Sequence, residues 1–412
     1  MFAFFEYKPI LLILIILFLL LVIFYILEEL YHLYTLKQIP YRIHVNGTRG
    51  KSSVARLIAA GLRAGDIATC CKTTGTLARF IDTKGNETPV FRVGFTNIIE
   101  QVVIIRKARK LQTQALVIEC MALQPLLQSL CELKIVRSTH GVLTNARPDH
   151  LDVMGPEPKD VALALAATVP VKGKYFTPET IQLPVFQMAT KDRKSELFHI
   201  SENDINSVTD EDVAGFCYAE FKENIALALK VCASLGVSKE VAIKGMWEAK
   251  PDPGAMTKHD FSYESTQILF ANGFAANDPV STEILWHKLL DEYQNEFEAV
   301  LMLNCRDDRQ DRTLQFVDVI PQWRQPKAIV LIGTGCDVFT KAYKRKAKTQ
   351  AQLIDLEEKD ENEIIQSIAA KFNAKKVLLV GIGNIYGVGL RLIDVIQLHQ
   401  TNGEKENKEE GH

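Results

Sequence analysis

The sequence predicts an α/β protein in which an N-terminal membrane-spanning helix precedes two domains, each built on a mostly parallel sheet. Three observations support this prediction: an unbroken apolar run near the N-terminus, an alternation of short apolar segments with helical ones, and a Pro/Gly-rich interruption that divides this alternation in two. The chain has 412 residues, of which 47% are hydrophobic, and this is enough for two or three hydrophobic cores.

The apolar run extends from Ile10 to Leu27 and contains no charged residue. As a helix it measures about 27 Å, close to the thickness of the hydrocarbon core of a bilayer. A cleaved signal peptide is the alternative, but the run is longer than the apolar part of a usual signal, and "EELYHLYTLK" after it offers no small-residue cleavage site. We therefore predict an uncleaved membrane anchor in residues 1–38.

Basic residues flank this run unequally, because Lys37, Arg42 and Arg49 follow it and only Lys8 precedes it. The positive-inside rule then predicts a single-pass protein of the cell membrane with a cytoplasmic body.

The eight cysteines include no C-x-x-C pair and no zinc-ligand spacing, which favours free thiols in a reducing compartment. The net charge of −2 gives no global basic field, so we expect no nucleic-acid partner.

Strands and helices alternate after the anchor. Strands are expected at "YRIHVNG", "ALVIEC" and "STHGVLTN", and a helix at "FKENIALALKVCASLGV". We assign residues 39–250 to a first domain, because "EAKPDPGAM" then breaks the pattern. Strands at "EAVLMLNC", "KAIVLIGTG" and "KKVLLVGIGN" indicate a second, smaller, Rossmann-like domain in residues 251–395. The polar tail, residues 396–412, is expected to be disordered.

The first predicted strand runs directly into "GTRGKSS" and then into a helical segment. This order points backbone N–H groups and the positive end of a helix at one place, where polyphosphate binds. Lys51 supplies a charge for the β and γ phosphates, and Ser52 offers a hydroxyl to Mg²⁺. The strict P-loop pattern requires a glycine where Val45 stands, so this is a shorter form. A glycine-rich turn that merely caps a helix is the alternative.

Two further strand ends carry polar side chains. Glu119 is the last side chain of "ALVIEC", where nucleotide-binding enzymes present a carboxylate to a metal beside the phosphates. Asn145, Asp149 and His150 follow the third strand, in "LTNARPDHLDVMG", together with Asp152. A simple turn at "RPDH" is the alternative for this second group.

The three stretches "NGTRGKSS", "IECMAL" and "LTNARPDHLDVMG" resemble, in this order, the ATP-binding motifs of the Mur ligase superfamily, which includes the folylpolyglutamate synthetases. With the N-terminal anchor, the set is most similar to the catalytic B subunits (CapB type) of poly-γ-glutamate synthases. The resemblance covers residues 40–160. It implies a fold class of α/β with an N-terminal transmembrane helix, a P-loop-type parallel-sheet ATPase domain and a smaller Rossmann-like C-terminal domain.

The resemblance also implies roles for individual residues. Lys51, Glu119 and His150 would be catalytic, and Ser52, Glu119 and His150 would hold metal. Contacts to the nucleotide would come from one continuous loop and one further side chain: Asn46, Gly47, Thr48, Arg49, Gly50, Lys51, Ser52, Ser53 and Asn145. The segment "TTGTLARF" (73–80) corresponds to a loop that such ligases place near the growing substrate.

The activity implied is that of an ATP-dependent amide ligase, which forms γ-glutamyl linkages through an acyl-phosphate with ATP and Mg²⁺ as cofactors. The implied partners are glutamate, the poly-γ-glutamate chain, the membrane and small multi-spanning membrane subunits of a synthase complex, and a homo-oligomer is possible. The alternatives are a membrane-anchored P-loop ATPase and a nucleotide-binding scaffold subunit without ligase activity. The N-K-x-D signature of GTPases is absent from the sequence.

The sequence also departs from the ligase pattern. Ala255 stands where the linker of these ligases has an arginine, and Asn277-Asp278-Pro279 replaces part of a motif of their C-terminal domain. Mur-type ligases commonly carry a carbamoylated lysine some fourteen or fifteen residues beyond the metal-binding histidine. The corresponding segment, 161–170, contains no lysine, and Lys172 and Lys174 lie beyond Pro170. We therefore expect an enzyme that works without a carbamate.

Overall fold

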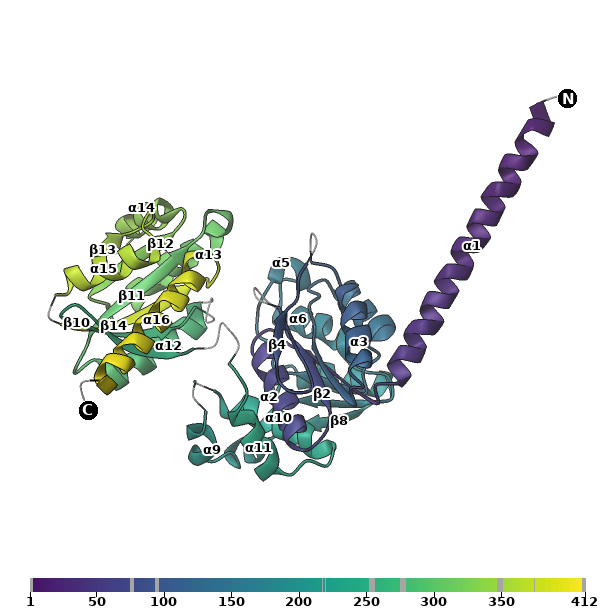
Figure 1. Ribbon diagram of the computed structural model, residues 1–412, viewed down its shortest axis with the longest axis horizontal. Coiled ribbons are helices and arrows are strands. Elements are labelled where there is room, and N and C mark those ends of the chain that lie inside the picture. The colour runs from purple at the N-terminus through teal and green to yellow at the C-terminus, as the bar shows by residue number, and fades with distance from the viewer. Residues whose placement is uncertain are drawn as a thin grey trace. The chain divides into compact units, whose positions relative to one another are not determined.

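The computed structural model describes residues 3–409 except for 75–77, 93–95, 217, 219, 252–255, 275–278, 347–350 and 374 (Figure 1). The chain forms two compact units. The first unit comprises the residues up to Phe216 together with Glu220–Lys250, and the second unit begins at Pro251. Both are α/β, so the predicted fold class is confirmed.

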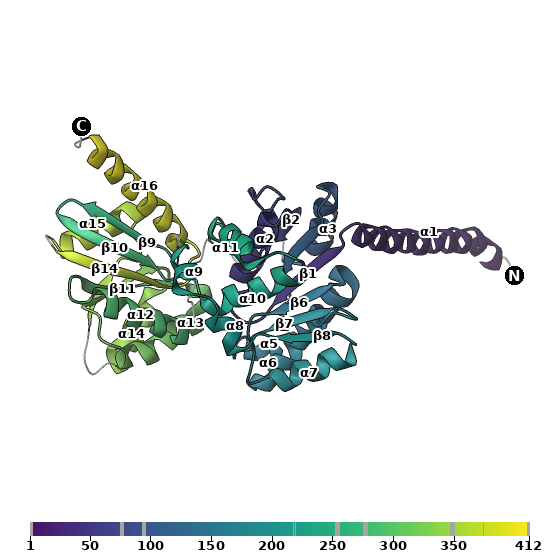
Figure 2. The same cartoon turned by 90° about the horizontal axis from the view of Figure 1, so that it is seen from below.

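The chain begins with one long helix, α1 (Ala3–Lys37), which extends away from the sheet of the first unit in both views (Figures 1 and 2). Its most apolar window of 18 residues has a mean hydropathy of 3.7, and the stretch from Ile10 to Lys37 is long and apolar enough to cross a membrane. The side chains from Ile10 to Leu27 are exposed, as expected of a helix whose apolar surface faces lipid.

The last turns of α1 belong to the fold of the first unit. His32, Thr35 and Leu36 are buried, and Leu36 joins Ile39 in a hydrophobic cluster beneath the sheet. The Nε2 atom of His32 lies 2.8 Å from the carbonyl oxygen of Ile135. The segment predicted as an anchor therefore contains an exposed apolar part and a part that packs against the first unit, a division that hydropathy alone did not predict.

The first unit contains an eight-stranded sheet in the order β4-β3-β2-β5-β1-β6-β7-β8. All neighbouring strands are parallel except β3, which is antiparallel to β2 and to β4. The strands are β1 (Tyr41–Asn46), β2 (Thr69–Lys72), β3 (Arg79–Ile81), β4 (Glu87–Pro89), β5 (Ala115–Glu119), β6 (His140–Leu143), β7 (Lys174–Thr177) and β8 (Glu196–His199).

Helices surround this sheet, and α2 packs against α10 and α11. They are α2 (Lys51–Ala64), α3 (Glu100–Lys110), α4 (Pro125–Leu130), the π-helical η1 (Cys131–Val136), α5 (Leu151–Met154), α6 (Pro158–Leu165), the 3₁₀ turn η2 (Ala166–Thr168), α7 (Leu183–Asp192), α8 (Glu202–Asn206), α9 (Asp210–Ala214), α10 (Lys222–Ser234) and α11 (Lys239–Trp247).

Side chains alternate between the two faces of the central strands. Leu116 and Ile118 of β5 pack in the cluster that includes Ile104 and Ile105 of α3. Glu119 has the opposite parity and meets α2, because Ser52 donates a hydrogen bond to it. The helices α2 and α3 therefore cover opposite faces of the sheet.

A buried ion pair lies under the central strand β1. The Nδ1 atom of His44 lies 2.8 Å from Oε2 of Glu132, and Ser138 donates backbone and side-chain hydrogen bonds to the other carboxylate oxygen. Burial alone would lower the pKa of His44, but hydrogen bonds with Cys120, Cys131 and Glu132 outweigh it and raise this pKa well above its usual value. The pair joins β1 to η1 on the α3 face of the sheet.

The second unit contains a six-stranded sheet in the order β13-β12-β11-β14-β10-β9, parallel except for the edge strand β9. Its elements are β9 (Lys258–Tyr263), β10 (Thr266–Asn272), α12 (Pro279–Tyr293), β11 (Glu298–Cys305), η3 (Asp307–Arg309), α13 (Gln310–Val319), η4 (Ile320–Gln322), β12 (Ala328–Gly333), α14 (Cys336–Lys346), β13 (Gln352–Asp355), α15 (Glu361–Lys371), β14 (Lys376–Gly383) and α16 (Val388–Glu409).

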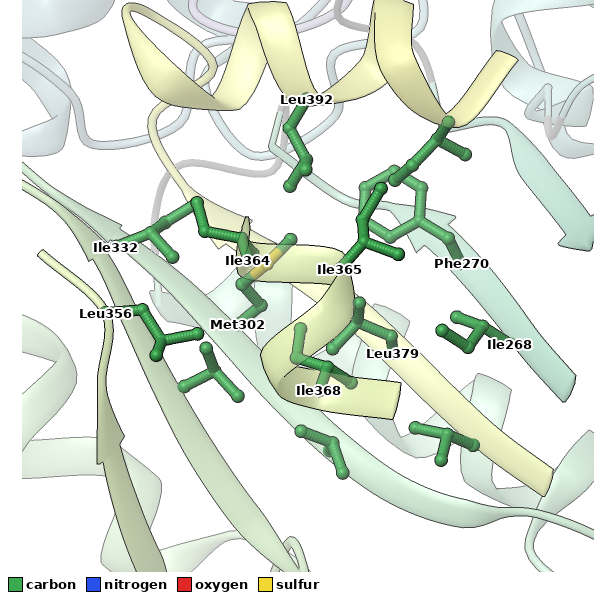
Figure 3. Packing of buried hydrophobic residues seen from close by; sticks show 14 of the residues in the cluster. Ile268, Phe270, Met302, Ile332, Leu356, Ile364, Ile365, Ile368, Leu379 and Leu392 are labelled. Atoms are coloured by element: carbon green, nitrogen blue, oxygen red, sulfur yellow. The ribbon is translucent and has the colours of Figure 1, made fainter. Parts of the chain in front are cut away.

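Hydrophobic clusters line both faces of this second sheet. In one of them, Met302 and Leu379 of the sheet meet Ile364 and Ile368 of α15 and Leu392 of α16 (Figure 3). Helix α16 continues to Glu409, through most of the tail for which the sequence analysis expects disorder. The difference has a physical reason, because the helix begins on buried apolar residues and its polar continuation, rich in Glu and Lys, favours helix.

The packing of α1 predicts different outcomes for two truncations. A chain that lacks residues 1–27 should keep the thermal stability of the first unit, because only lipid-facing side chains are removed. A chain that lacks residues 1–36 should melt several degrees lower, at a cost of about 2–5 kcal/mol, because the buried Leu36 and its neighbours are lost.

Calorimetry or circular dichroism in one mild detergent would compare these truncations with the full-length chain. Equal melting temperatures for both would contradict the assignment of the last turns of α1 to the hydrophobic core.

Candidate active site

The loop between β1 and α2 forms a cradle of backbone N–H groups. Gly47 has a φ of 137°, and a Cβ atom there would lie 2.1 Å from the hydroxyl of Thr144, so no other residue fits. Gly50, with a φ of 78°, precedes the first turn of α2, where no side chain caps the helix. The N–H groups of this first turn therefore remain available to an anion, as a phosphate site requires.

Lys51 begins α2 and folds back over the loop. Its Nζ atom donates to the carbonyl oxygens of Gly47, at 2.7 Å, and Thr48, at 3.2 Å. These bonds hold the ammonium group beside the exposed amides of the cradle. A positive charge in this position can pair with the terminal phosphates of a nucleotide.

Glu119 stands beside the cradle at the end of β5 and is only 3% exposed. One carboxylate oxygen accepts hydrogen bonds from the Ser52 hydroxyl, at 2.8 Å, and from the backbone N–H of Thr74, at 2.7 Å. The other accepts one from the Thr74 hydroxyl, at 2.5 Å. Among the described residues Glu119 forms no direct salt bridge, and the buried Lys72 ammonium interacts with its charge at longer range.

The donor set around Glu119 fits a hard divalent cation. Ser52 and Thr74 offer two hydroxyl oxygens, each within hydrogen-bonding distance of the Glu119 carboxylate. Mg²⁺ binds through one or two protein oxygens, waters and substrate phosphates, and so needs no larger protein cage. These oxygen donors are chemically suited to the metal role predicted for Ser52 and Glu119, which stays a prediction.

The strand end after β6 fastens the other side of the cradle. The Thr48 hydroxyl donates to Oδ1 of Asn145 at 2.6 Å, and the Asn145 amide donates to the carbonyl oxygen of Arg49 at 3.1 Å. The Arg49 backbone N–H also donates to Oδ1 of Asn145. Asn145 therefore holds the loop in shape. Its side chain already makes these three hydrogen bonds, so a contact to the nucleotide would come in addition to them.

His150 lies on the same sheet edge but outside this network of contacts. It has a φ of 48°, precedes the short helix α5, and is 30% exposed at the side chain. Its Nε2 atom lies 3.9 Å from Oδ1 of Asp149, whose other oxygen lies 3.6 Å from the Arg49 guanidinium. Its predicted role in holding a second metal stays a prediction.

The side chain of Asn46 lies on the other face of the sheet. Its amide donates to Gln128, at 2.8 Å, and to Thr168, at 3.1 Å. The reason is the two-residue period of a strand, which places Asn46 on the same face as His44 and opposite α2. The Asn46 side chain thus points away from the cradle and its carbonyl oxygen accepts hydrogen bonds from Thr144, so the nucleotide contact of Asn46 stays a prediction.

The sequence predicts Thr74 in a loop near the substrate but not its contact to Glu119, and it does not indicate Asn224 at all. Thr74 binds Glu119, and the side chain of Asn224 lies 3.3 Å from the place of a Cβ atom on Gly50. Thr74 follows the carboxyl end of β2 and shares an edge with Glu119, so a prediction of β2 would have found it. Asn224 is in the first turn of α10, which only the tertiary fold brings to the loop.

A buried network lies beside Thr74. Lys72, fully buried, forms a 2.7 Å ion pair with Glu100, which also pairs with Arg92 at 2.6 Å. Burial lowers the pKa of Lys72, although the hydrogen bond to Glu100 opposes this.

The loop expected near the growing substrate (73–80) is described only in part, because residues 75–77 lie outside the described residues.

The predicted motifs of the second unit are only partly visible. Ala255, Asn277 and Asp278 lie outside the described residues.

The two lysines nearest to the expected carbamate position lie far from the cradle. Lys174 and Lys172 are at the amino-terminal end of β7, whereas the cradle is at the carboxyl ends of parallel strands. Neither lysine can therefore replace the carbamoylated lysine of the ligases.

Comparison with known proteins relates the whole chain to one group of enzymes. Residues 45–166 match the Mur ligase middle domain, and residues 258–399 match the poly-gamma-glutamate synthase CapB C-terminal domain. The capsule biosynthesis protein CapB of Bacillus anthracis is 36% identical over 92% of this chain and 81% of its own length. The PGA synthase CapB of Bacillus subtilis is 35% identical over 91% of this chain and 95% of its own length.

Solved structures share the fold at lower identity. FolC of E. coli in complex with ADP superposes with a TM-score of 0.65 at 16% identity, over 90% of this chain and 93% of its own. MurF from Acinetobacter baumannii gives a TM-score of 0.63 at 15% identity, over 90% of this chain and 79% of its own. A bifunctional folylpolyglutamate synthase/dihydrofolate synthase from Yersinia pestis, complexed with AMPPNP and Mn ion, also gives 0.65 at 13% identity, over 90% of this chain and 92% of its own.

The environment of Glu119 predicts the effect of Glu119→Gln. The amide can keep the contacts to Ser52 and Thr74 but removes the negative charge, so the Mg²⁺ concentration needed for binding of a fluorescent ATP analogue should rise about tenfold or more. Magnesium titrations of the variant and the unaltered protein would measure this.

Glu196→Gln, a change to an exposed carboxylate at the start of β8, is the matched control and should leave the titration unchanged. The metal role of Glu119 is wrong if the Glu119→Gln titration coincides with that of the control.

Proposed function

The chain belongs to the CapB family of poly-γ-glutamate synthases, which have the Mur ligase fold, and we propose that its first unit uses ATP to join glutamate through γ-amide bonds. The observation that carries this proposal is the convergence of Lys51, Ser52 and Glu119 at the free N-terminus of α2. This constellation can hold a triphosphate and a divalent cation at one point. The family supplies the class of reaction, an ATP-dependent amide ligation.

The reaction requires activation of a carboxylate, because a carboxylate and an amine do not condense in water. A carboxylate oxygen attacks the γ-phosphorus of ATP, the bond from this phosphorus to the β–γ bridging oxygen breaks, and ADP leaves. The amine of the incoming glutamate then attacks the acyl carbon, phosphate leaves, and the amine loses a proton. Both steps depend mainly on positioning and on neutralised charge, as in phosphoryl transfer generally.

The residues of the cradle supply this positioning. Lys51 sits where its ammonium group can follow the negative charge that moves from the γ-phosphate toward ADP. The amides after Gly50 hold the phosphate oxygens, and Asn145 keeps the loop in shape through its bonds to Thr48 and Arg49. A divalent cation bound by Ser52 and Glu119 would lower the charge on the phosphates when present. We propose Mg²⁺ for this site.

The acceptor is a polyanion, and basic side chains should guide it. Arginines near the cradle are candidates for this role, but Arg92 is engaged by Glu100. Arg306, Arg309 and Arg312 line one pocket of the second unit together with Asn304, and we propose this pocket for acceptor binding, although Arg306 is paired with Asp308. The cytoplasmic orientation, the small membrane subunits and the homo-oligomer stay predictions.

Lys51→Ala should abolish ligation while α1 still inserts into the membrane, because the change removes the charge that faces the phosphates and leaves the anchor intact. With ATP, Mg²⁺, glutamate and an oligomeric acceptor, the unaltered protein should release phosphate only when acceptor is present. Added hydroxylamine should trap the acyl-phosphate as a hydroxamate, which separates a ligase from a plain ATPase or a scaffold.

Lys191→Ala, at an exposed position of α7, is the matched control and should behave like the unaltered protein. Normal turnover by Lys51→Ala would reject the cradle, and phosphate release without any hydroxamate would reject the ligase chemistry.

The lack of a lysine at 161–170 predicts that activity does not depend on bicarbonate. Lys172→Ala and Lys174→Ala should each keep most of the activity, because both residues lie at the far end of β7. Assays in buffer freed of carbon dioxide, with and without added bicarbonate, would measure this. A strong bicarbonate requirement, or a carbamate found on either lysine by mass spectrometry, is the contrary outcome.

A further inference from the structure

The structure gathers basic side chains around α1 at the place where its apolar run ends. Glu28 and Glu29, the first two residues beyond Leu27, form ion pairs with Arg106 of α3 and with Arg137, which follows η1. These contacts fix α3 and η1 beside the helix as it leaves the apolar run.

Aromatic contacts hold the same elements one and two turns further along α1. The guanidinium of Arg106 lies 5.2 Å from the ring centre of Tyr31. That of Arg109 lies 5.6 Å from the Tyr31 ring and 4.8 Å from the Tyr34 ring. With the bond of His32 to the backbone of Ile135, these contacts make a rigid connection between α1 and the first unit.

The positions along the helix give the depth of this connection. Tyr31 and Tyr34 follow the last residue of the apolar run, Leu27, by about 6 Å and about 10 Å along the helix axis. The polar headgroup layer on each side of a bilayer is roughly 5–8 Å thick. If Ile10–Leu27 crosses the hydrocarbon core, Arg106 and Arg109 therefore lie at the level of the headgroups or just outside it.

The charge at this level is strongly positive. We call the basic collar the six cationic side chains of α3 and the η1 segment, namely Arg106, Lys107, Arg109, Lys110, Lys134 and Arg137. Of the acidic residues around it, Glu28 and Glu29 face it, whereas Glu132 is buried against His44 and Glu100 is paired with Lys72 and Arg92. Lys107, Lys110 and Lys134 are exposed and form no salt bridge among the described residues, although Lys107 also donates to the Thr88 hydroxyl and lies over the Phe80 ring.

Exposed apolar side chains accompany these lysines. Val103 of α3 is 61% exposed, Leu111 is 41% exposed just after α3, and Leu133 of η1 is 37% exposed. Cations interleaved with apolar groups suit the boundary between headgroups and acyl chains, where each finds its own environment.

We propose that the basic collar binds the anionic phospholipid headgroups of the leaflet from which α1 emerges. This rests on the proposal that α1 is a membrane anchor, and it adds a second, electrostatic contact that presents one face of the first unit to the membrane. Basic side chains near an anionic leaflet are attracted to it over about a Debye length, so the contact should weaken at high salt.

The test uses the full-length protein in nanodiscs that contain a photoreactive lipid. A phosphatidylglycerol with the photoreactive group on its headgroup should cross-link peptides of α3 and η1. The triple variant Lys107→Gln, Lys110→Gln, Lys134→Gln should lower this cross-linking about tenfold or more, because it removes three cations and leaves the contacts to α1 intact. A phosphatidylcholine probe should react weakly with both proteins.

The control variant carries Lys191→Gln, Lys194→Gln and Lys244→Gln, three exposed lysines on other elements of the first unit, and should cross-link like the unaltered protein. A lipid with its photoreactive group on the acyl chain should label α1 in all three proteins. Headgroup cross-linking that is equal in the triple variant and the unaltered protein, or equal for both headgroups, would overturn the proposal. Loss of acyl-chain labelling of α1 would instead refute the anchor itself.

Discussion

The register of β1 between β5 and β6 is the constraint on which the site depends. Parallel pairing sets Val45 opposite Glu119 and Asn46 opposite Leu143, so three strand ends reach one edge together. Ligands bind beyond such carboxyl ends because the loops there are free to differ while the sheet holds them. A shift of one residue would turn Glu119 to the α3 face, away from Ser52, and would dismantle the metal position without changing any side chain.

The same strand connects the site to the membrane segment. Tyr41 begins β1 four residues after the end of α1, and the ion pair of His44 with Glu132 ties β1 to η1, which also contacts α1 through Ile135. A rigid path therefore runs from the lipid-facing helix to the nucleotide loop. For an enzyme whose product is a long polyanion, this path and the basic collar restrict how the first unit can lie against a negatively charged surface.

The sequence predicted the long buried strands well, since β5, β11, β12 and β14 are apolar runs that only a core can accommodate. It missed β2 and β3, which are short and form no pattern by themselves, and with β2 it missed the contact between Thr74 and Glu119. It also assigned Asn46 to the nucleotide as part of a motif. The face on which a strand residue lies depends on its parity, and here Asn46 shares the face of His44 and bonds Gln128.

The sequence by itself determined the cradle, its lysine and the carboxylate of Glu119, because glycines with positive φ and a strand that ends in a charged residue are local features. It also determined the apolar span from Ile10 to Leu27. Only the tertiary structure decided that α3, some seventy residues further along the chain, surrounds the end of this span with cations. The charges close to the apolar span in the sequence are Lys37 and Arg42. The ion pairs and ring contacts that α3 and η1 make with α1 form only when these elements pack together in the folded chain.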